Sequence, residues 1–231
     1  MNIREFHSWN VSPKEAIEIQ NQLSSRIVIA PLKRGVKKIA GVDASYSKRD
    51  QTIWAAVVVM DMQSLQTIEE GWCREEVRYP YIPGLLSFRE IPAILNALKG
   101  LKNEPDLILC DGQGIAHPRR MGIATHLGLI LDIPTIGCAK NLLIGYSKAP
   151  PDRKGSFTYI RYKKEIVGAS LRTREGVKPV YISPGYGIEL KDSISIIVRC
   201  ITKYRLPEPI REAHRLSNSL RKKEEACYKS I

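Results

Sequence analysis

Two aspartates stand within or directly after apolar runs, where a carboxylate is costly unless something neutralises it. Asp43 lies in the apolar stretch 39–44, and Asp111 follows the apolar stretch 107–110. A charge among residues that belong in a sheet core needs a partner or a metal. If the two strands are neighbours, mutual repulsion of the carboxylates favours a divalent cation, and oxygen ligands favour Mg²⁺ or Mn²⁺ over Zn²⁺. Alternatively, each Asp only caps the turn that follows it.

Three further residues could complete such a site. Glu90 ends the sequence Ser-Phe-Arg-Glu at 87–90, a capping-box pattern, so it could either join the acidic cluster or satisfy the start of its own helix. Lys140 follows a predicted strand and could neutralise a phosphate, or it could be an ordinary solvated lysine. His214 lies beside the apolar face of a predicted helix, where a lone histidine is more often structural than catalytic.

The segment from Pro80 to Gly84, Pro-Tyr-Ile-Pro-Gly, is unusual for an exposed loop because its two prolines stiffen an apolar tip made of Tyr81 and Ile82. A rigid apolar tip beside an acidic site suits a wedge that unstacks bases and fills the vacated space. The alternative is that Tyr81 and Ile82 fold back into the core.

The segment 111–120 joins the second aspartate to glycines and then to basic residues. Gly112 and Gly114 allow a backbone to approach a ligand closely, and His117 and Arg119 are potential phosphate donors. The segment lacks the Gly-Lys-Ser/Thr ending of a Walker loop and the third glycine of a dinucleotide-binding fingerprint.

The elements that must position these residues follow from hydrophobic periodicity. A capping box at Ser12 and Glu15 begins a helix over 13–26. Runs at 38–47, 52–61 and 65–77, with polar turns around 48–50 and 62–64, predict an antiparallel meander. Helices over 87–99 and 119–131 then alternate with strands at 106–110 and 134–139, which predicts a parallel extension.

The rest of the chain returns to strands and then helices. Strands are predicted at 157–162, 165–170 and 180–183, with Lys163 and Lys164 at a hairpin tip. Helices are predicted over about 192–203 and 208–222, with the charged run 221–225 as a solvated helix end or a basic contact. The sequence therefore predicts an α/β fold with one mixed β-sheet, an antiparallel meander plus parallel strands, flanked by helices.

Composition limits the classes of protein and of partner. The chain has 231 residues, 43% hydrophobic and 26% charged, which excludes disordered and fibrous classes and favours one domain over 1–231. The net charge of +12 favours a polyanionic partner. Five widely spaced cysteines suggest neither a zinc ribbon nor a disulfide framework, and no apolar run has the length of a membrane span. We therefore expect a cytoplasmic protein without a membrane partner.

Four ordered blocks, 40–43, 80–84 with Glu90, 111–119 and 137–140, together resemble the endonuclease V family, the deoxyinosine 3′ endonucleases. The resemblance implies a ribonuclease-H-like fold and a Mg²⁺-dependent monomer, in which Mn²⁺ can substitute. It further implies recognition of deoxyinosine, and of other deaminated bases, in DNA. The second phosphodiester bond 3′ to the lesion would be hydrolysed, leaving 3′-hydroxyl and 5′-phosphate ends.

The resemblance also assigns roles to residues. Asp43, Glu90 and Asp111 would form the acidic metal site, His214 would lie near the metal, and Lys140 would lie near the scissile phosphate. Tyr81 would head the DNA wedge, and the other predicted DNA contacts are Pro80, Ile82, Pro83, His117 and Arg119. The pocket for the flipped base would be lined by small and apolar residues, Gly84, Leu86, Gly112, Gly122, Ile123, Ala139 and Leu143. One departure is Tyr186, where related sequences often have His, so any role of that His is in doubt here.

Two alternatives remain open. A related ribonuclease-H-like nuclease acting on inosine-containing RNA, or on branched DNA, would share the acids and differ in substrate. A non-catalytic nucleic-acid-binding module would explain the positive charge but not the clustered acids.

Overall fold

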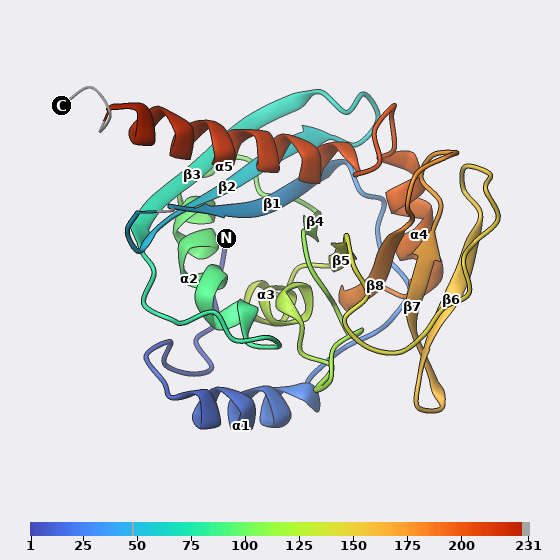
Figure 1. The fold of residues 1–231 in the computed structure, drawn as a ribbon, viewed down its shortest axis with the longest axis horizontal. Helices are drawn as coiled ribbons and strands as arrows, with labels where there is room; N and C mark the ends of the chain where they lie inside the picture. Colours follow the sequence, from blue (N-terminus) through green and yellow to red (C-terminus); the bar gives the residue numbers. More distant parts are fainter. Residues whose placement is uncertain (48, 228–231) are drawn as a thin grey trace.

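Eight strands form one mixed sheet in the order β3-β2-β1-β4-β5-β8-β7-β6 (Figure 1). The computed structural model describes residues 1–47 and 49–227. The strands are β1 (Lys38–Tyr46), β2 (Thr52–Asp61), β3 (Thr67–Glu76), β4 (Leu107–Cys110), β5 (Thr135–Ala139), β6 (Phe157–Tyr162), β7 (Glu165–Leu171) and β8 (Val180–Tyr186). The helices are α1 (Pro13–Ser24), α2 (Leu86–Lys99), α3 (Ile123–Leu131), α4 (Leu190–Arg199) and α5 (Glu208–Cys227).

The strand directions confirm the predicted mixed sheet. Strands β1, β2 and β3 form an antiparallel meander, while β4 and β5 run parallel to β1. Strands β8, β7 and β6 then add three antiparallel pairings. Because β1, β4 and β5 run the same way, their carboxyl ends meet at one edge of the sheet, where open α/β sheets usually place their sites.

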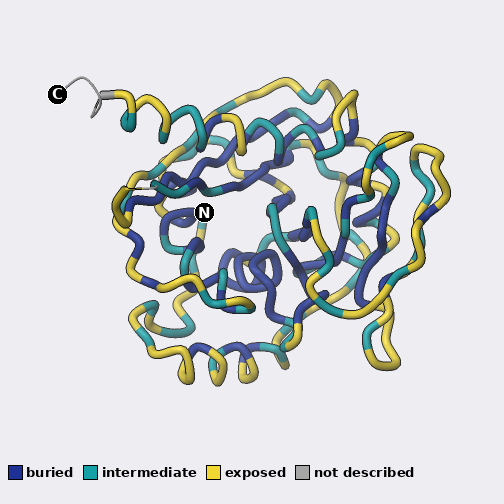
Figure 2. Tube along the Cα trace, in the orientation of Figure 1, coloured by how far each residue is buried: buried dark blue, intermediate teal, exposed yellow. Residues whose placement is uncertain are grey.

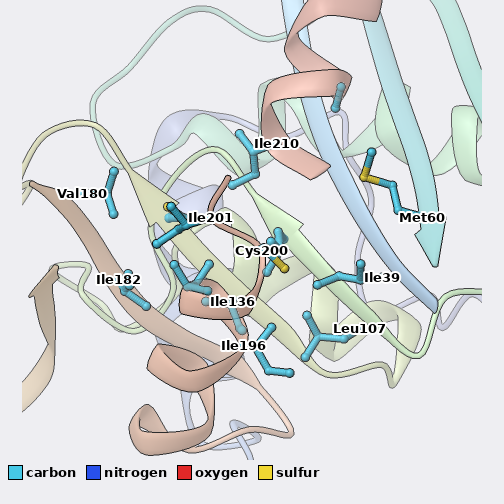
Figure 3. Packing of buried hydrophobic residues seen from close by; sticks show 14 of the residues in the cluster. Ile39, Met60, Leu107, Ile136, Val180, Ile182, Ile196, Cys200, Ile201 and Ile210 are labelled. Carbon is cyan, nitrogen blue, oxygen red and sulfur yellow. The ribbon is translucent and has the colours of Figure 1, made fainter. Parts of the chain in front are cut away.

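Helices cover both faces of the sheet. Helices α4 and α5 pack on one face, and α2 and α3 pack on the other. Successive side chains of β1 point to opposite faces of the sheet and so enter two different cores. Ile39 belongs to the core beneath α4 and α5, and Ala40 and Val42 belong to the core beneath α2 and α3. Figure 3 shows the first core, where Ile39, Leu107 and Ile136 meet Cys200 of the segment that follows α4. Burial on both faces explains why β2 reads as an unbroken apolar run.

Several predicted boundaries need correction. The helix predicted from Arg119 begins at Ile123 instead, because Arg120 adopts a left-handed backbone (φ 58°) that interrupts a helix. The helix predicted over 192–203 spans Leu190–Arg199, and the last helix extends past 222 to Cys227. An ion pair of 2.9 Å between Arg221 and Glu225, one turn apart, supports that extension.

Other local predictions are confirmed or untested. Ser12 and Glu15 form the predicted capping box at the start of α1. Tyr162 pairs with Glu165 across the predicted hairpin tip between β6 and β7. Lys48, part of the turn predicted around 48–50, lies outside the described residues.

Two further features bear on the class of protein. No helix in the described part of the chain has both the length and the apolar character needed to span a membrane. Among the cysteines with described side chains, Cys73, Cys110, Cys138 and Cys200 carry free thiols.

Helix α5 packs on the sheet more closely than a side chain would permit. A β-carbon added at Gly41 in β1 would lie 2.0 Å from the backbone oxygen of Pro209, at the start of α5. Pro209 cannot retreat without moving the helix, so Gly41 fixes the distance between α5 and β1.

We expect Gly41→Ala to lower the free energy of unfolding by about 1–3 kcal/mol, because the added methyl group forces α5 away from the sheet. Denaturant unfolding monitored by circular dichroism measures the change. Gly100→Ala is the matched control, since nothing lies within 4 Å of a β-carbon at Gly100, and its effect should stay within about 0.5 kcal/mol. Equal stability of the two variants would contradict the assigned role of Gly41.

Candidate active site

Asp43 and Asp111 lie side by side at the edge where β1 and β4 run in parallel. Val42 of β1 pairs with Cys110, the last residue of β4, so Asp43 and Asp111, which follow them, lie at the same level of the sheet. Oxygens of the two carboxylates and a ring nitrogen of His214 lie within 4.8 Å of one another. The predicted proximity of the two aspartates is therefore confirmed.

Helix α5 supplies the partners of Asp43. The His214 ring donates from Nδ1 to Asp43 Oδ2 at 3.0 Å, and the buried Ser217 hydroxyl donates to the same oxygen at 2.9 Å. The hydrogen bond to Asp43 raises the pKa of His214. His214 and Ser217 are one turn apart on α5, so a single helix face holds this carboxylate.

Lys140 lies at the same edge, directly after β5. Its ammonium group is 2.5 Å from Asp111 Oδ2, while the side chain stays half-exposed. Burial raises the pKa of Asp111, and the neighbouring Lys140 partly offsets that increase. The cation therefore contacts the acidic cluster and remains accessible to a ligand from solvent.

Glu90 approaches the cluster from the other face of the sheet, on α2. It is buried, and the Tyr46 hydroxyl donates to its Oε1 at 2.7 Å. Burial, with added repulsion from Asp43 and Asp111, raises the pKa of Glu90 to about 8. Glu90 does not belong to the set of ligand atoms within 4.8 Å, so it stands as a neighbouring carboxylate.

The capping alternative for Glu90 is wrong. Helix α2 begins at Leu86, and its N-cap residue Leu85 makes no side-chain capping bond. The Ser87 hydroxyl, which a capping box would use, is buried without a hydrogen-bond partner among the described residues. The Ser-Phe-Arg-Glu pattern thus lies two residues too late to cap the helix, because its Ser87 would have to stand at the position of Leu85.

A cavity of about 360 Å³ opens beside Asp111 and Lys140. All seven residues predicted for the base pocket line it: Gly84, Leu86, Gly112, Gly122, Ile123, Ala139 and Leu143. A β-carbon on Gly122 would lie 2.2 Å from the Gln113 carbonyl oxygen, so this wall is built from backbone in close contact. The sequence did not single out Gln113 and Asn141, which also line the cavity and are joined by a 2.9 Å hydrogen bond.

The loop from Pro80 to Gly84 forms one rim of this cavity. Tyr81 is 71% exposed, whereas Ile82 packs partly against the small core around Phe88. The alternative in which both side chains fold inward is therefore wrong for Tyr81 and partly right for Ile82. Gly84 turns the chain with φ 82°, a conformation that favours glycine.

Comparison with known proteins decides the family. A sequence profile described as Endonuclease V matches residues 21–215. Endonuclease V of Dictyoglomus turgidum is 48% identical over 94% of each chain. The crystal structure of endonuclease V from Streptomyces avermitilis shares 37% identity at a TM-score of 0.89 and covers 97% of this chain and 100% of that one. The chain belongs to the endonuclease V family.

The resemblance drawn from the four sequence blocks is thereby confirmed, and with it the ribonuclease-H-like class of fold. Membership makes the chain an enzyme, a DNA-binding hydrolase of phosphodiester bonds associated with DNA repair. One solved relative bears on substrate: Ciona intestinalis endonuclease V was crystallised with a 24mer DNA containing an inosine followed by a ribo-adenosine. That structure shares 28% identity at a TM-score of 0.79 and covers 91% of this chain and 98% of its own.

In this endonuclease V, His117 and Arg119 both hold the rim loop in place. His117 Nε2 and Arg119 Nη2 each donate to the Gly84 carbonyl oxygen at 2.9 Å, and Gln20 donates to the same oxygen at 3.1 Å. His117 is buried beneath the loop but also lines the cavity, so its predicted contact with DNA stays a prediction. Arg119 supports the loop through its own bond to the Gly84 carbonyl oxygen.

Tyr186, the departure from the family pattern, lies away from the acidic cluster. It pairs with Thr135 at the amino end of β5, whereas Lys140 follows the carboxyl end of that strand. Its hydroxyl donates to Asp132 at 2.8 Å. The substitution therefore leaves the acidic edge of this endonuclease V untouched.

Because His117 is buried, its contribution to the stability of the protein depends on pH. Burial, with a smaller contribution from Arg119, lowers the pKa of His117 to about 4, against 6.5 in the unfolded chain. The unfolded state therefore takes up a proton first as the pH falls, so this part of the stability is present above pH 6.5 and is lost toward pH 4.

We expect the difference in unfolding free energy between wild type and His117→Gln to be about 2 kcal/mol smaller at pH 5 than at pH 7. Glutamine keeps a donor for Gly84 but does not titrate, so the variant isolates the proton-linked part. Urea denaturation of both proteins at the two pH values provides the measurement. A difference that does not change with pH would show that His117 is not held neutral.

Proposed function

We propose that this endonuclease V recognises deoxyinosine in DNA and hydrolyses the second phosphodiester bond 3′ to the lesion, leaving 3′-hydroxyl and 5′-phosphate ends. One observation supports this proposal above the others. A cluster of two carboxylates, an imidazole and a lysine ammonium adjoins a cavity of about 360 Å³, whose rim bears an exposed tyrosine. The Ciona relative bound to inosine-containing DNA supports the choice of base.

The donor set supports a divalent cation, which we propose is Mg²⁺, with Mn²⁺ able to substitute. Asp43 and Asp111 would be ligands through carboxylate oxygens, and His214 lies close enough to contribute. When bound, the ion would activate water and offset charge on the phosphate. Glu90 would act from behind the cluster, because Tyr46 already occupies one of its oxygens.

The chain's own residues would do the remaining work. Lys140, half-exposed and beside Asp111, would offset negative charge on the scissile phosphate. Ser217 and His214 keep Asp43 in one orientation, which limits reorganisation during the reaction.

Base selection would take place in the cavity. Its volume lies within the range of small-molecule pockets, and its walls are largely glycine backbone and apolar side chains, which suit a flipped base. Hypoxanthine pairs poorly with thymine, so extruding it costs less than extruding a normal base. Backbone groups around Gly112 and Gly122 would then read its edge.

We further propose that the chain works as one domain, as a monomer, in the cytoplasm. The single continuous sheet supports the first point, and the free thiols of the described cysteines support a reducing compartment. A second candidate substrate is inosine in RNA, favoured by the ribo-adenosine that follows the inosine in the Ciona complex.

We expect Asp43→Ala or Asp111→Ala to slow cleavage of a deoxyinosine oligonucleotide in Mg²⁺ by a factor on the order of 10³ or more, while binding survives. Glu18→Ala, which removes an exposed carboxylate on α1, is the control. Parallel assays on inosine RNA and undamaged DNA rank the substrates, and end-labelled products locate the cut. Full activity in either Asp variant would refute the metal site.

For the rim, we expect Tyr81→Ala to lower the ratio of inosine cleavage to undamaged-strand cleavage by about tenfold, because the ring no longer replaces the extruded base in the stack. Tyr81→Phe keeps the ring and should retain most of the ratio. Single-turnover cleavage of matched oligonucleotides gives both rates. A ratio that is unchanged in Tyr81→Ala would remove the wedge from the mechanism.

A further inference from the structure

Three aromatic side chains are exposed together at the β6 edge of the sheet, where no core needs them. Tyr146 is 66% exposed, Tyr159 47% and Phe157 40%. The rings of Phe157 and Tyr159 meet edge to face at 5.5 Å between centroids. Figure 2 shows exposed chain along this edge. A contiguous aromatic surface left in water indicates a binding function. We call Tyr146, Phe157 and Tyr159 the aromatic row.

Backbone pairing places the row on one face. Tyr146 and Arg161 exchange two backbone hydrogen bonds of 3.0 and 2.9 Å, so their side chains point the same way. Tyr159 and Phe157 are two and four residues before Arg161 in β6, and alternation puts them on that same face. Arg161 therefore lies among the three aromatic residues.

The row is also held in place before any ligand arrives. A β-carbon at Gly145 would lie 2.5 Å from the Arg161 carbonyl oxygen, and Gly145 has φ 76°, so only glycine lets the chain approach β6 this closely. A 2.8 Å hydrogen bond between the hydroxyls of Ser147 and Thr158 also joins the two segments. A ring on a fixed backbone loses little freedom on binding.

The charge around the row favours a polyanion. Residues 140–164 contain seven Lys or Arg and a single Asp. That Asp152 is itself paired with Arg172 at 3.2 Å, so it neutralises none of the seven. Proteins that bind single-stranded nucleic acid combine aromatic rings, on which bases stack, with positive charges, which contact phosphates.

The aromatic row is linked to the proposed active site both along the chain and across the sheet. Leu143 lines the cavity and Tyr146 is three residues later, a span of at most about 11 Å. Across the sheet, Cys138 pairs with Ile182, Ile182 with Ala169, and Ala169 with Tyr159. These three steps put Tyr159 about 14 Å from Cys138, which immediately precedes Ala139 and Lys140, a distance that a few nucleotides of one strand can span.

We propose that the aromatic row binds the single-stranded continuation of the substrate strand, with Tyr146 and Tyr159 stacking on bases a few nucleotides from the flipped base. This inference rests on the proposed function, because it names where the strand goes after it leaves the cavity. The strand follows the rim formed by residues 140–148, and Lys148 and Arg161 contact its phosphates.

The test is binding of single-stranded deoxyinosine oligonucleotides in EDTA, measured by fluorescence anisotropy. One oligonucleotide extends about ten nucleotides on both sides of the inosine, and two others are cut back to about two on the 5′ or the 3′ side, short of the row. We expect Tyr146→Ala and Tyr159→Ala each to raise the Kd for the long oligonucleotide about tenfold. Truncation on the side that reaches the row should abolish this difference.

Two controls separate stacking from damage. Tyr146→Phe keeps a ring and should bind as wild type does, and Trp72→Ala removes an aromatic residue, 56% exposed, from β3 at the opposite edge of the sheet. Unchanged binding of the long oligonucleotide by both alanine variants would overturn the proposal. So would an equal loss on all three lengths, or a change in sedimentation without a change in binding, which would indicate a protein interface.

Cleavage assays in Mg²⁺ distinguish a failure of this proposal from a failure of the proposed function on which it rests. Wild type that cuts no inosine substrate contradicts the proposed function, whatever the binding data show. Variants that cut the truncated oligonucleotide at the wild-type rate, yet bind the long one weakly, support the aromatic row. Wild-type rates and affinities throughout leave the proposed function intact and refute the row.

Discussion

The structure depends on keeping two carboxylates side by side at the edge of a buried sheet. Parallel pairing of β1 and β4 forces Asp43 and Asp111 into proximity, where like charges repel each other, and burial raises the pKa of Asp111. Each is met by a positive or hydrogen-bonding partner, Lys140 for Asp111 and the α5 pair for Asp43. Removing one partner would leave a buried charge uncompensated, which is why these contacts matter more than surface ion pairs of similar length.

That constraint reaches across the whole chain. His214 and Ser217 are more than 170 residues from Asp43 in sequence, so α5 must dock accurately for the first aspartate to be neutralised. Gly41 sets that docking distance, two residues before Asp43 on the same strand face. A residue without a side chain thus controls the electrostatics of the site through the position of a helix.

The sequence predicts the fold and the two aspartates because both rest on local signals. Periodicity identifies the strands and helices, and a carboxylate in an apolar run is recognisable without a structure. Glu90 was ambiguous because a capping box and a functional acid share one pattern. The N-cap of α2 at Leu85, two residues before Ser87, decided between them. The bond from His117 to the rim loop gave no signal, because nothing nearby in sequence reveals that the Gly84 carbonyl lies within reach. Gln113 and Asn141 gave no signal because their contact joins two loops.

Part of the net positive charge is concentrated in one segment of the chain. A chain of +12 could spread its basic residues evenly, yet residues 140–164 hold seven of the 36 Lys and Arg with one acid. This segment leaves the sheet at Lys140, beside the acidic cluster, and returns as the edge strand β6. Opposite charges therefore occupy adjacent zones, and a polyanion attracted to the basic zone has its phosphates brought to the edge of the acidic one. Carboxylates alone would repel a phosphodiester; the neighbouring cations make its approach favourable.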